Sequence, residues 1–132
     1  VGNGKTYLCE ALAIELYKRS KFVRVSTMSS IMATLKAAIK PEVGKPPLEY
    51  KVNQFCIVER LIIDDVGMGG SGSAWEYGKL EEIVCYRYRE RLLTVLTTNR
   101  DPKELPERIV SRFNDPEVGL CVLNEGADYR RK

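Results

Sequence analysis

Apolar residues recur at helical spacing in the first part of the chain. Between residues 6 and 20, Leu8, Leu12 and Leu16 are four positions apart, and charged residues lie elsewhere in the segment. This spacing puts the leucines on one face, so it predicts a helix with one buried stripe. Residues 22–27 (FVRVST) are few and rich in β-branched side chains, which predicts a strand directly after this helix.

The same alternation continues along the chain. Four further helices are predicted where apolar residues keep a helical period, and three further strands where short apolar runs lie between turn residues. Strands that alternate with helices, each strand largely apolar, indicate a parallel sheet covered on both faces. The predicted helices cover residues 28–40 (opened by Ser29), 48–58, 75–91 and 106–113, and the strands cover residues 61–65, 92–98 and 119–124.

Composition narrows the class of protein. The 132 residues fit one domain, and a hydrophobic content of 44% is enough for a core. No apolar run approaches the roughly 18 residues that span a bilayer, and no signal peptide precedes the first motif, so we expect a soluble, cytoplasmic protein without a membrane partner. A net charge of +3 does not by itself indicate a nucleic-acid partner.

The four cysteines have neither the spacing nor the partners of a metal or redox site. None of them forms a CxxC pair, and the chain contains no histidine. A zinc site and a redox motif are therefore excluded. Free cysteine packs as a small hydrophobic residue in a reducing compartment, so we expect Cys9, Cys56, Cys85 and Cys121 in the core.

A glycine-rich motif opens the chain. Residues 1–6 (VGNGKT) match the last six positions of the phosphate-binding pattern G-x-x-x-x-G-K-[ST]. Glycines let backbone N–H groups face phosphate oxygens, a helix that begins at Lys5 adds its positive dipole end, and Thr6 would hold magnesium. For this motif alone, a glycine-rich turn before a helix is the alternative. The predicted ATP-binding residues are Gly2, Asn3, Gly4, Lys5, Thr6 and Tyr7.

A second, acidic motif strengthens the phosphate-loop interpretation. Residues 61–65 (LIIDD) are a predicted buried strand that ends in two aspartates. In phosphate-loop enzymes such a strand ends in an acid that orders the water shell of magnesium, a role predicted for Asp64. Asp65 stands where a general base facing the γ-phosphate would be. A turn acid at a strand end is the alternative, and the two motifs together predict a site for ATP and Mg²⁺.

Residues 67–72 (GMGGSG) also satisfy G-x-G-x-x-G, the pattern of a dinucleotide-binding site. We reject that interpretation, because the two aspartates before these glycines would repel a pyrophosphate and no βαβ unit leads into them. A mobile loop beside the ATP site is the better prediction.

The order of several motifs resembles a known family. The motifs occur in the order LIIDDVG, Trp75, YRYRERLLTVLTTN, ERIVSRF and GADYRRK. In these motifs and their order the chain resembles the AAA+ ATPases of the DnaC and DnaI helicase-loader group, which includes the IstB transposition helper. The likeness spans essentially all 132 residues. It implies one domain over residues 1–132, an α/β P-loop NTPase sandwich of three layers with a central parallel sheet. Its first strand would be truncated at the phosphate loop, and the chain would end before the sensor 2 helix is complete.

The resemblance also implies roles for single residues. Asn99 resembles the sensor 1 residue that hydrogen-bonds the attacking water or the γ-phosphate, with an ordinary turn asparagine as the alternative. Arg112 resembles an arginine finger that reaches the ATP site of a neighbouring subunit. Arg108, one helical turn away, shares its predicted face, so either arginine could reach the neighbour, with a solvated arginine pair as the alternative. Arg130 resembles sensor 2. Many AAA+ members carry glutamate where Asp65 stands, so we expect slow, regulatory hydrolysis.

The predicted helix over residues 28–40 occupies the place where initiators and loaders carry an extra helix that contacts single-stranded DNA. Lys36 and Lys40 lie one turn apart on it and are candidate phosphate contacts, and a solvated helix face is the equal alternative. The block at residues 86–91 mixes tyrosines with arginines. Because Tyr88 shares the apolar stripe of its helix, structural use of this block outweighs DNA contact, with subunit packing as a further alternative.

The resulting expectation is an ATP-binding and ATP-hydrolysing AAA+ switch that loads or remodels a replicative helicase on single-stranded DNA. Its subunits would associate through the ATP site. Three alternatives stay open: an IstB-like transposition helper, a P-loop kinase that phosphorylates a small molecule, and a nucleotide-gated binding module with negligible catalysis.

Overall fold

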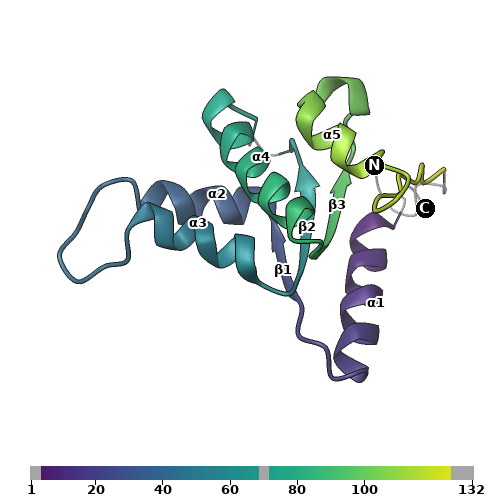
Figure 1. The fold of residues 1–132 in the computed structure, drawn as a ribbon, viewed down its shortest axis with the longest axis horizontal. Coiled ribbons are helices and arrows are strands. Elements are labelled where there is room, and N and C mark those ends of the chain that lie inside the picture. Colours follow the sequence, from purple (N-terminus) through teal and green to yellow (C-terminus); the bar gives the residue numbers. More distant parts are fainter. Residues whose placement is uncertain (1–3, 69–71, 126–132) are drawn as a thin grey trace, which may run out of the picture.

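The chain folds into a three-stranded parallel sheet with helices around it, in a computed structural model that describes residues 4–68 and 72–125 (Figure 1). The strand order is β1-β2-β3, which puts β2 in the centre of the sheet. In chain order the elements are α1 (Lys5–Lys18), β1 (Arg24–Thr27), α2 (Met28–Ala37), α3 (Leu48–Ile57), β2 (Arg60–Val66), α4 (Ala74–Arg89), β3 (Leu93–Thr98), the 3₁₀ turn η1 (Pro102–Glu104) and α5 (Glu107–Phe113).

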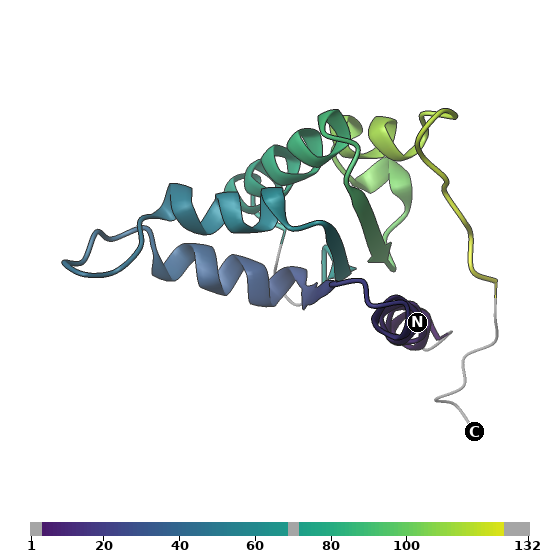
Figure 2. The same cartoon turned by 60° about the horizontal axis from the view of Figure 1, so that its bottom comes forward.

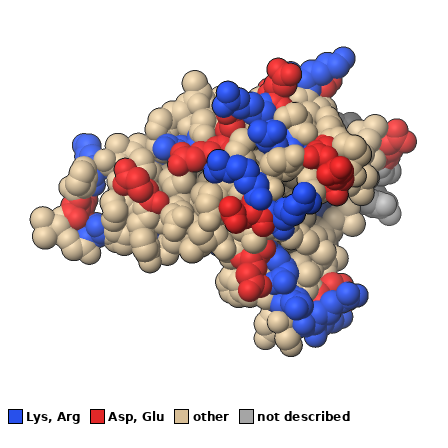
Figure 3. Space-filling view, viewed as in Figure 1, with Lys and Arg blue, Asp and Glu red and all other residues tan. Residues whose placement is uncertain are grey.

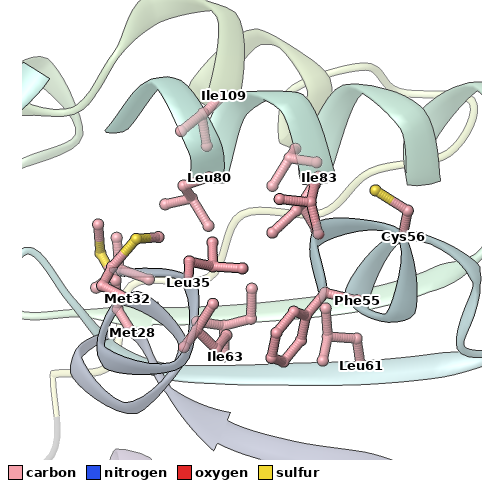
Figure 4. Packing of buried hydrophobic residues seen from close by; sticks show 14 residues of the cluster. Met28, Met32, Leu35, Phe55, Cys56, Leu61, Ile63, Leu80, Ile83 and Ile109 are labelled. Carbon is pink, nitrogen blue, oxygen red and sulfur yellow. The ribbon is translucent and has the colours of Figure 1, made fainter. Parts of the chain in front are cut away.

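Helices α2 to α5 lie together on one side of the sheet, and α1 lies apart from them, against β2 (Figure 2). This three-layer arrangement is the predicted one. The main core fills the space between the sheet and the larger helical layer, where Phe55, Leu80 and Ile83 meet (Figure 4). Leu61, Ile62 and Ile63 on β2 are all fully buried, which explains why this central strand is a continuous apolar run without alternation.

Two predicted helices differ from the observed ones in what they bury. On α1 the residue in the core is Cys9, whereas Leu8 is 62% exposed, so the predicted leucine stripe is not a buried face. Among the sheet strands α1 packs mainly on β2. This one strand covers only the narrow face of α1 around Cys9. Helix α2 ends at Ala37, and Ile39 beyond it is half exposed. Its N-cap is Thr27, whose hydroxyl accepts the Ser30 N–H at 3.1 Å, and not Ser29.

The last predicted strand, over residues 119–124, is wrong. This segment carries no strand, and its apolar side chains Leu120, Val122 and Leu123 are exposed. A strand needs a neighbour for its backbone hydrogen bonds, and within the described ranges β3 pairs with β2 alone. The prediction for the cysteines is half right, because Cys9 and Cys56 are buried, Cys85 is half-buried and Cys121 is exposed.

The core contains one buried arginine that the sequence pattern did not predict. The guanidinium of Arg87, on α4, is fully buried between α3 and β3. It donates hydrogen bonds to the hydroxyl of Thr94 and to four backbone carbonyls, those of Phe55, Cys56, Val58 and Leu93, at 2.5 to 3.0 Å. The side chain therefore ties the end of α3 to the start of β3.

The turn after β2 requires glycine at one position, which gives a stability prediction. Gly67 has a φ of 80°, and an added Cβ would lie 2.8 Å from the hydroxyl oxygen of Tyr77 and 3.1 Å from Cγ of Arg100. Gly67→Ala is expected to lower the free energy of unfolding by about 1–3 kcal/mol. Gly78→Ala is the matched control. It lies in the exposed interior of α4 with no atom within 4 Å of an added Cβ, and should stabilise the protein by about 0.5–1 kcal/mol.

Urea unfolding followed by circular dichroism checks both variants. Equal midpoints for Gly67→Ala and Gly78→Ala would contradict the requirement for a left-handed glycine after β2.

No helix in the described ranges is long and apolar enough to cross a membrane.

Candidate functional site

The first turn of α1 meets the carboxyl end of β2. Gly4 is the N-cap of α1 and has a φ of 86°, a left-handed conformation that suits glycine. Thr6, in the first turn, donates a hydrogen bond of 2.8 Å from its hydroxyl to Oδ2 of Asp64. The two predicted motifs, 58 positions apart in the sequence, are thus in direct contact. Lys5 is the first residue of α1, next to the helix N-terminus that would face phosphate.

The carboxylate of Asp64 is buried and accepts hydrogen bonds from three side chains. Asp64 is only 5% exposed, and its Oδ1 accepts hydrogen bonds from the hydroxyl of Thr97 and, at 4.0 Å, from the thiol of Cys9. Burial, together with the charges of Asp64 and Asp65, raises the pKa of the Cys9 thiol to about 11, so this thiol stays neutral. Neutral donors from α1 and β3 therefore hold Asp64 between them.

Asp65 occupies an irregular position at the end of the same strand. Its φ is 57°, which is left-handed and uncommon for a residue other than glycine. The pairing of β2 with β3 shifts register between Ile63 and Val66, so Asp65 lies in a bulge. The Asp65 N–H donates a hydrogen bond of 3.1 Å to the hydroxyl oxygen of Thr97.

Asn99 lies at the same edge of the sheet as the aspartates. It is exposed and comes directly after β3, whose carboxyl end lies beside that of β2 because the strands are parallel. Arg100, which the sequence did not single out, joins these two strand ends. Its Nε donates to the carbonyl of Gly67 at 3.2 Å, and its N–H donates to the hydroxyl of Thr98 at 3.0 Å.

The candidate arginine finger lies elsewhere, on the face of α5 that packs against α4. Arg112 places its guanidinium carbon 4.8 Å from the ring centre of Tyr88, and its Nε is buried without a hydrogen-bond partner among the described residues. Arg108 pairs with Glu81 on α4 at 3.2 Å. The two arginines therefore share one face, as predicted, and neither is brought to Thr6 or Asp64. Tyr88 is half-buried and donates a hydrogen bond to Asp115.

The two candidate DNA-binding lysines are not one turn apart on a helix. Lys36 lies in the last turn of α2, but Lys40 lies beyond its end, because the helix stops at Ala37. The ammonium group of Lys36 lies 3.4 Å from Oε2 of Glu76, whose side chain is 4% exposed. Burial alone would raise the pKa of Glu76, yet hydrogen bonds with Ser73 and the charge of Lys36 hold that pKa below its usual value.

One face of the molecule carries charged side chains of both signs (Figure 3). On the face shown in Figure 3, basic and acidic side chains are interspersed over α4 and α5. That face carries no broad field of one sign, in agreement with the small net charge of +3.

Some predicted site residues lie outside the described ranges. Among the nucleotide-binding residues these are Gly2 and Asn3, and the sensor 2 candidate Arg130 is another. The glycine-rich loop at residues 67–72 is described only at its two ends. Tyr7 is described and is exposed on α1.

The residues that are described fit a magnesium ion bound together with ATP. No group of three or more His, Cys, Asp or Glu side chains that could hold a metal occurs within residues 4–68 and 72–125. A nucleotide-bound magnesium ion needs fewer protein ligands, because phosphate and water supply the rest. The Thr6 hydroxyl and the Asp64 carboxylate, already 2.8 Å apart, are the hard oxygen donors that phosphate-loop enzymes use for this ion.

Comparison with known proteins agrees with this geometry. No protein-family model matches the chain. In sequence it is 28% identical over 114 residues to the "Replicative helicase loader DnaC" of Escherichia coli strain K12, and the DnaC of Shigella flexneri matches equally. These matches cover 86% of this chain and 45% of the relatives, so the chain spans less than half the length of the curated relatives it matches.

The fold also matches solved structures of a replication initiator. The AMPPCP-bound DnaA of Aquifex aeolicus superposes with a TM-score of 0.72 at 27% identity, over 86% of this chain and 35% of that one. A "Replication initiator DnaA bound to AMPPCP and single-stranded DNA" gives 0.73 at 26% identity, over 87% and 35%. The predicted fold class and the predicted resemblance are therefore confirmed. The chain has the AAA+ ATPase fold, and in sequence it is similar to the DnaC helicase loaders.

Proposed function

We propose that this chain is the ATP-binding and ATP-hydrolysing core of a switch that loads a replicative helicase on single-stranded DNA. The observation that carries the ATP part is the hydrogen bond between Thr6 and Asp64. It joins a lysine-bearing helix N-terminus to a buried acid at a strand end, the two halves of a phosphate-loop site. The helicase part rests on the similarity to DnaC.

Each residue of the site has a definable task in this proposal. The N-terminus of α1 and the charge of Lys5 bind the phosphates, while Thr6 and Asp64 hold magnesium, which neutralises developing charge on the phosphates. Asp65 accepts a proton from, or orients, the attacking water. Asn99, at the neighbouring strand end, hydrogen-bonds that water or the γ-phosphate.

Replacing Thr6 by valine tests the ATP part. Valine keeps the shape of threonine but removes the hydroxyl that contacts Asp64, so we expect a loss of about 10- to 100-fold in MgATP affinity. Thr6→Ser keeps the hydroxyl and should stay within a few-fold of the wild-type protein. Isothermal titration with MgATP measures both affinities. Equal affinity for the wild-type protein and Thr6→Val would contradict the phosphate-loop assignment.

The partner is tested by ATP-dependent transfer of a replicative helicase to single-stranded DNA. In the proposed function, the protein deposits the helicase on DNA when ATP is present, and phosphate is released to solution. Transfer of a transposase instead would favour the IstB-like helper, and phosphate on a metabolite would favour the small-molecule kinase. ATP binding without any phosphate release would favour the nucleotide-gated module.

Contact with single-stranded DNA belongs to the same proposal. A DnaA whose fold matches this chain is bound to single-stranded DNA. Lys36 and Lys40 stay the candidate phosphate contacts, at the end of α2 and just beyond it. The ion pair with Glu76 partly neutralises the charge of Lys36, so Lys36 would bind a phosphate less strongly than Lys40.

A further inference from the structure

The bulge at the end of β2 places one residue of β3 opposite both aspartates. In the ladder, Ile63 pairs with Leu96 and Val66 pairs with Thr98. On β2 two residues, Asp64 and Asp65, lie between these two pairs. On β3 a single residue, Thr97, lies between the same two pairs. A bulge of this kind breaks the regular ladder and turns the side chains of the longer strand.

The hydroxyl of Thr97 contacts both aspartates at this bulge. It donates a hydrogen bond to the Asp64 carboxylate, and it accepts the Asp65 N–H at 3.1 Å. A hydroxyl can do both at once, since it has one proton and two lone pairs. Thr97 thereby binds the side chain of one acid and the backbone of the next.

The backbone of Asp65 needs such support. With a φ of 57°, a residue that carries a side chain is in a region that costs free energy and persists only when neighbours hold it. The bond from the Asp65 N–H to Thr97 supplies a partner that the interrupted ladder lacks. The direction of the Asp65 side chain therefore depends on Thr97.

We infer that Thr97 is a positioning residue that fixes the Asp64 and Asp65 carboxylates relative to each other. The functional part of this inference rests on the proposed ATPase function, in which one acid serves the metal and the other serves the water. Loss of the hydroxyl would let the two carboxylates move independently. Nucleotide would still bind, but the water would be poorly oriented.

Thr98 provides a matched control. It is the next residue of β3, and its hydroxyl also bridges to the end of β2, donating to the carbonyl of Val66 at 2.7 Å and accepting the Arg100 N–H at 3.0 Å. Among the described residues its hydrogen-bond partners are backbone groups, with no carboxylate. A role in strand-end structure alone would make Thr97→Val and Thr98→Val behave alike.

The first test compares MgATP binding and single-turnover hydrolysis in the wild-type protein, Thr97→Val, Thr97→Ser and Thr98→Val. We expect Thr97→Val to hydrolyse about tenfold more slowly or worse, with nucleotide affinity within about threefold. Thr97→Ser should restore most of the rate, and Thr98→Val should keep it. A Thr97→Val protein with the wild-type rate, or with the same defect as Thr98→Val, would overturn the inference.

A second readout needs no nucleotide. Hydrogen exchange followed by NMR should show the Asp65 amide exchanging at least about tenfold faster in Thr97→Val than in the wild-type protein, and unchanged in Thr98→Val. Unchanged protection of that amide in Thr97→Val would overturn the inference. If the wild-type protein does not hydrolyse ATP, the proposed function fails, and this exchange measurement alone decides whether Thr97 holds the bulge.

Discussion

Arg87→Met is expected to lower the free energy of unfolding by about 3–5 kcal/mol. The variant keeps much of the apolar stem but deletes the guanidinium, so the hydroxyl of Thr94 and four buried or partly buried backbone carbonyls lose a donor. Each buried polar group left without a partner costs about 1–3 kcal/mol. Breaking a buried charged network by removing one member costs about 3–5 kcal/mol in total. A domain has only about 5–15 kcal/mol of stability to lose.

The charge of Arg87 is compatible with burial because of where its partners lie. Phe55, Cys56 and Val58 are at the carboxyl end of α3, where the last carbonyls lack helical partners and the helix dipole is negative. Burial lowers the pKa of Arg87 to about 10, which still leaves the group protonated at neutral pH. The cation is therefore held by oriented carbonyls, and within the described part of the chain its hydrogen-bond acceptors include no carboxylate.

Urea unfolding measures the effect, with Arg89→Met as the control. Arg89 lies two positions further along α4 and is exposed, so its replacement should change the free energy of unfolding by no more than about 0.5 kcal/mol. Arg87→Lys should be intermediate, because lysine keeps the charge but has three donors in place of five. A wild-type midpoint for Arg87→Met would show that these five contacts contribute nothing to stability.

The sequence predicts the fold best where one element decides its own structure. Residues 61–65 are apolar on both faces, and a strand buried on both faces is the only element of that length which suits them, so β2 is predicted almost to its ends. The phosphate-loop motif and the two aspartates are predicted to form one site because phosphate-loop enzymes use both, and Thr6 does contact Asp64. Local pattern and topology are sufficient here.

Prediction from the sequence fails where burial depends on a neighbour. The leucines of α1 have the right spacing for a stripe, yet spacing cannot say which face the sheet covers, and Cys9 is the buried residue. Residues 119–124 look like a strand, but the pattern alone cannot say whether the chain returns to the sheet, and in the structure this segment is not paired with β3. In the sequence Arg87 is one of several basic residues in a block, and no local pattern predicts that the carbonyls of α3 surround it. Thr97 is missed for the same reason, because its role exists only through the bulge opposite.

Arg112→Ala is expected to reduce ATP hydrolysis by about 10³-fold or more while MgATP binding changes little. An arginine that neutralises transition-state charge on the transferring phosphate contributes about 10³–10⁵ to the rate. In this subunit Arg112 rests on Tyr88, on the face of α5 that packs on α4, and is not joined to Asp64. If Arg112 acts, it therefore acts on the ATP site of a neighbouring subunit. Arg108→Ala, whose exposed ion pair with Glu81 is worth little, is the control.

Mixing two inactive variants separates action between subunits from action within one. Lys5→Ala lacks the phosphate-binding charge but keeps Arg112, whereas Arg112→Ala keeps an intact phosphate loop. In an equimolar mixture about a quarter of head-to-tail interfaces would join an intact loop to an intact Arg112, so hydrolysis should recover to roughly that fraction. Arg112 acting within its own subunit would give no recovery, because no single chain then carries both groups. If Arg112 only supported the structure, Arg112→Ala would have a lower unfolding midpoint. Its hydrolysis would then fall only in proportion to the fraction of unfolded protein.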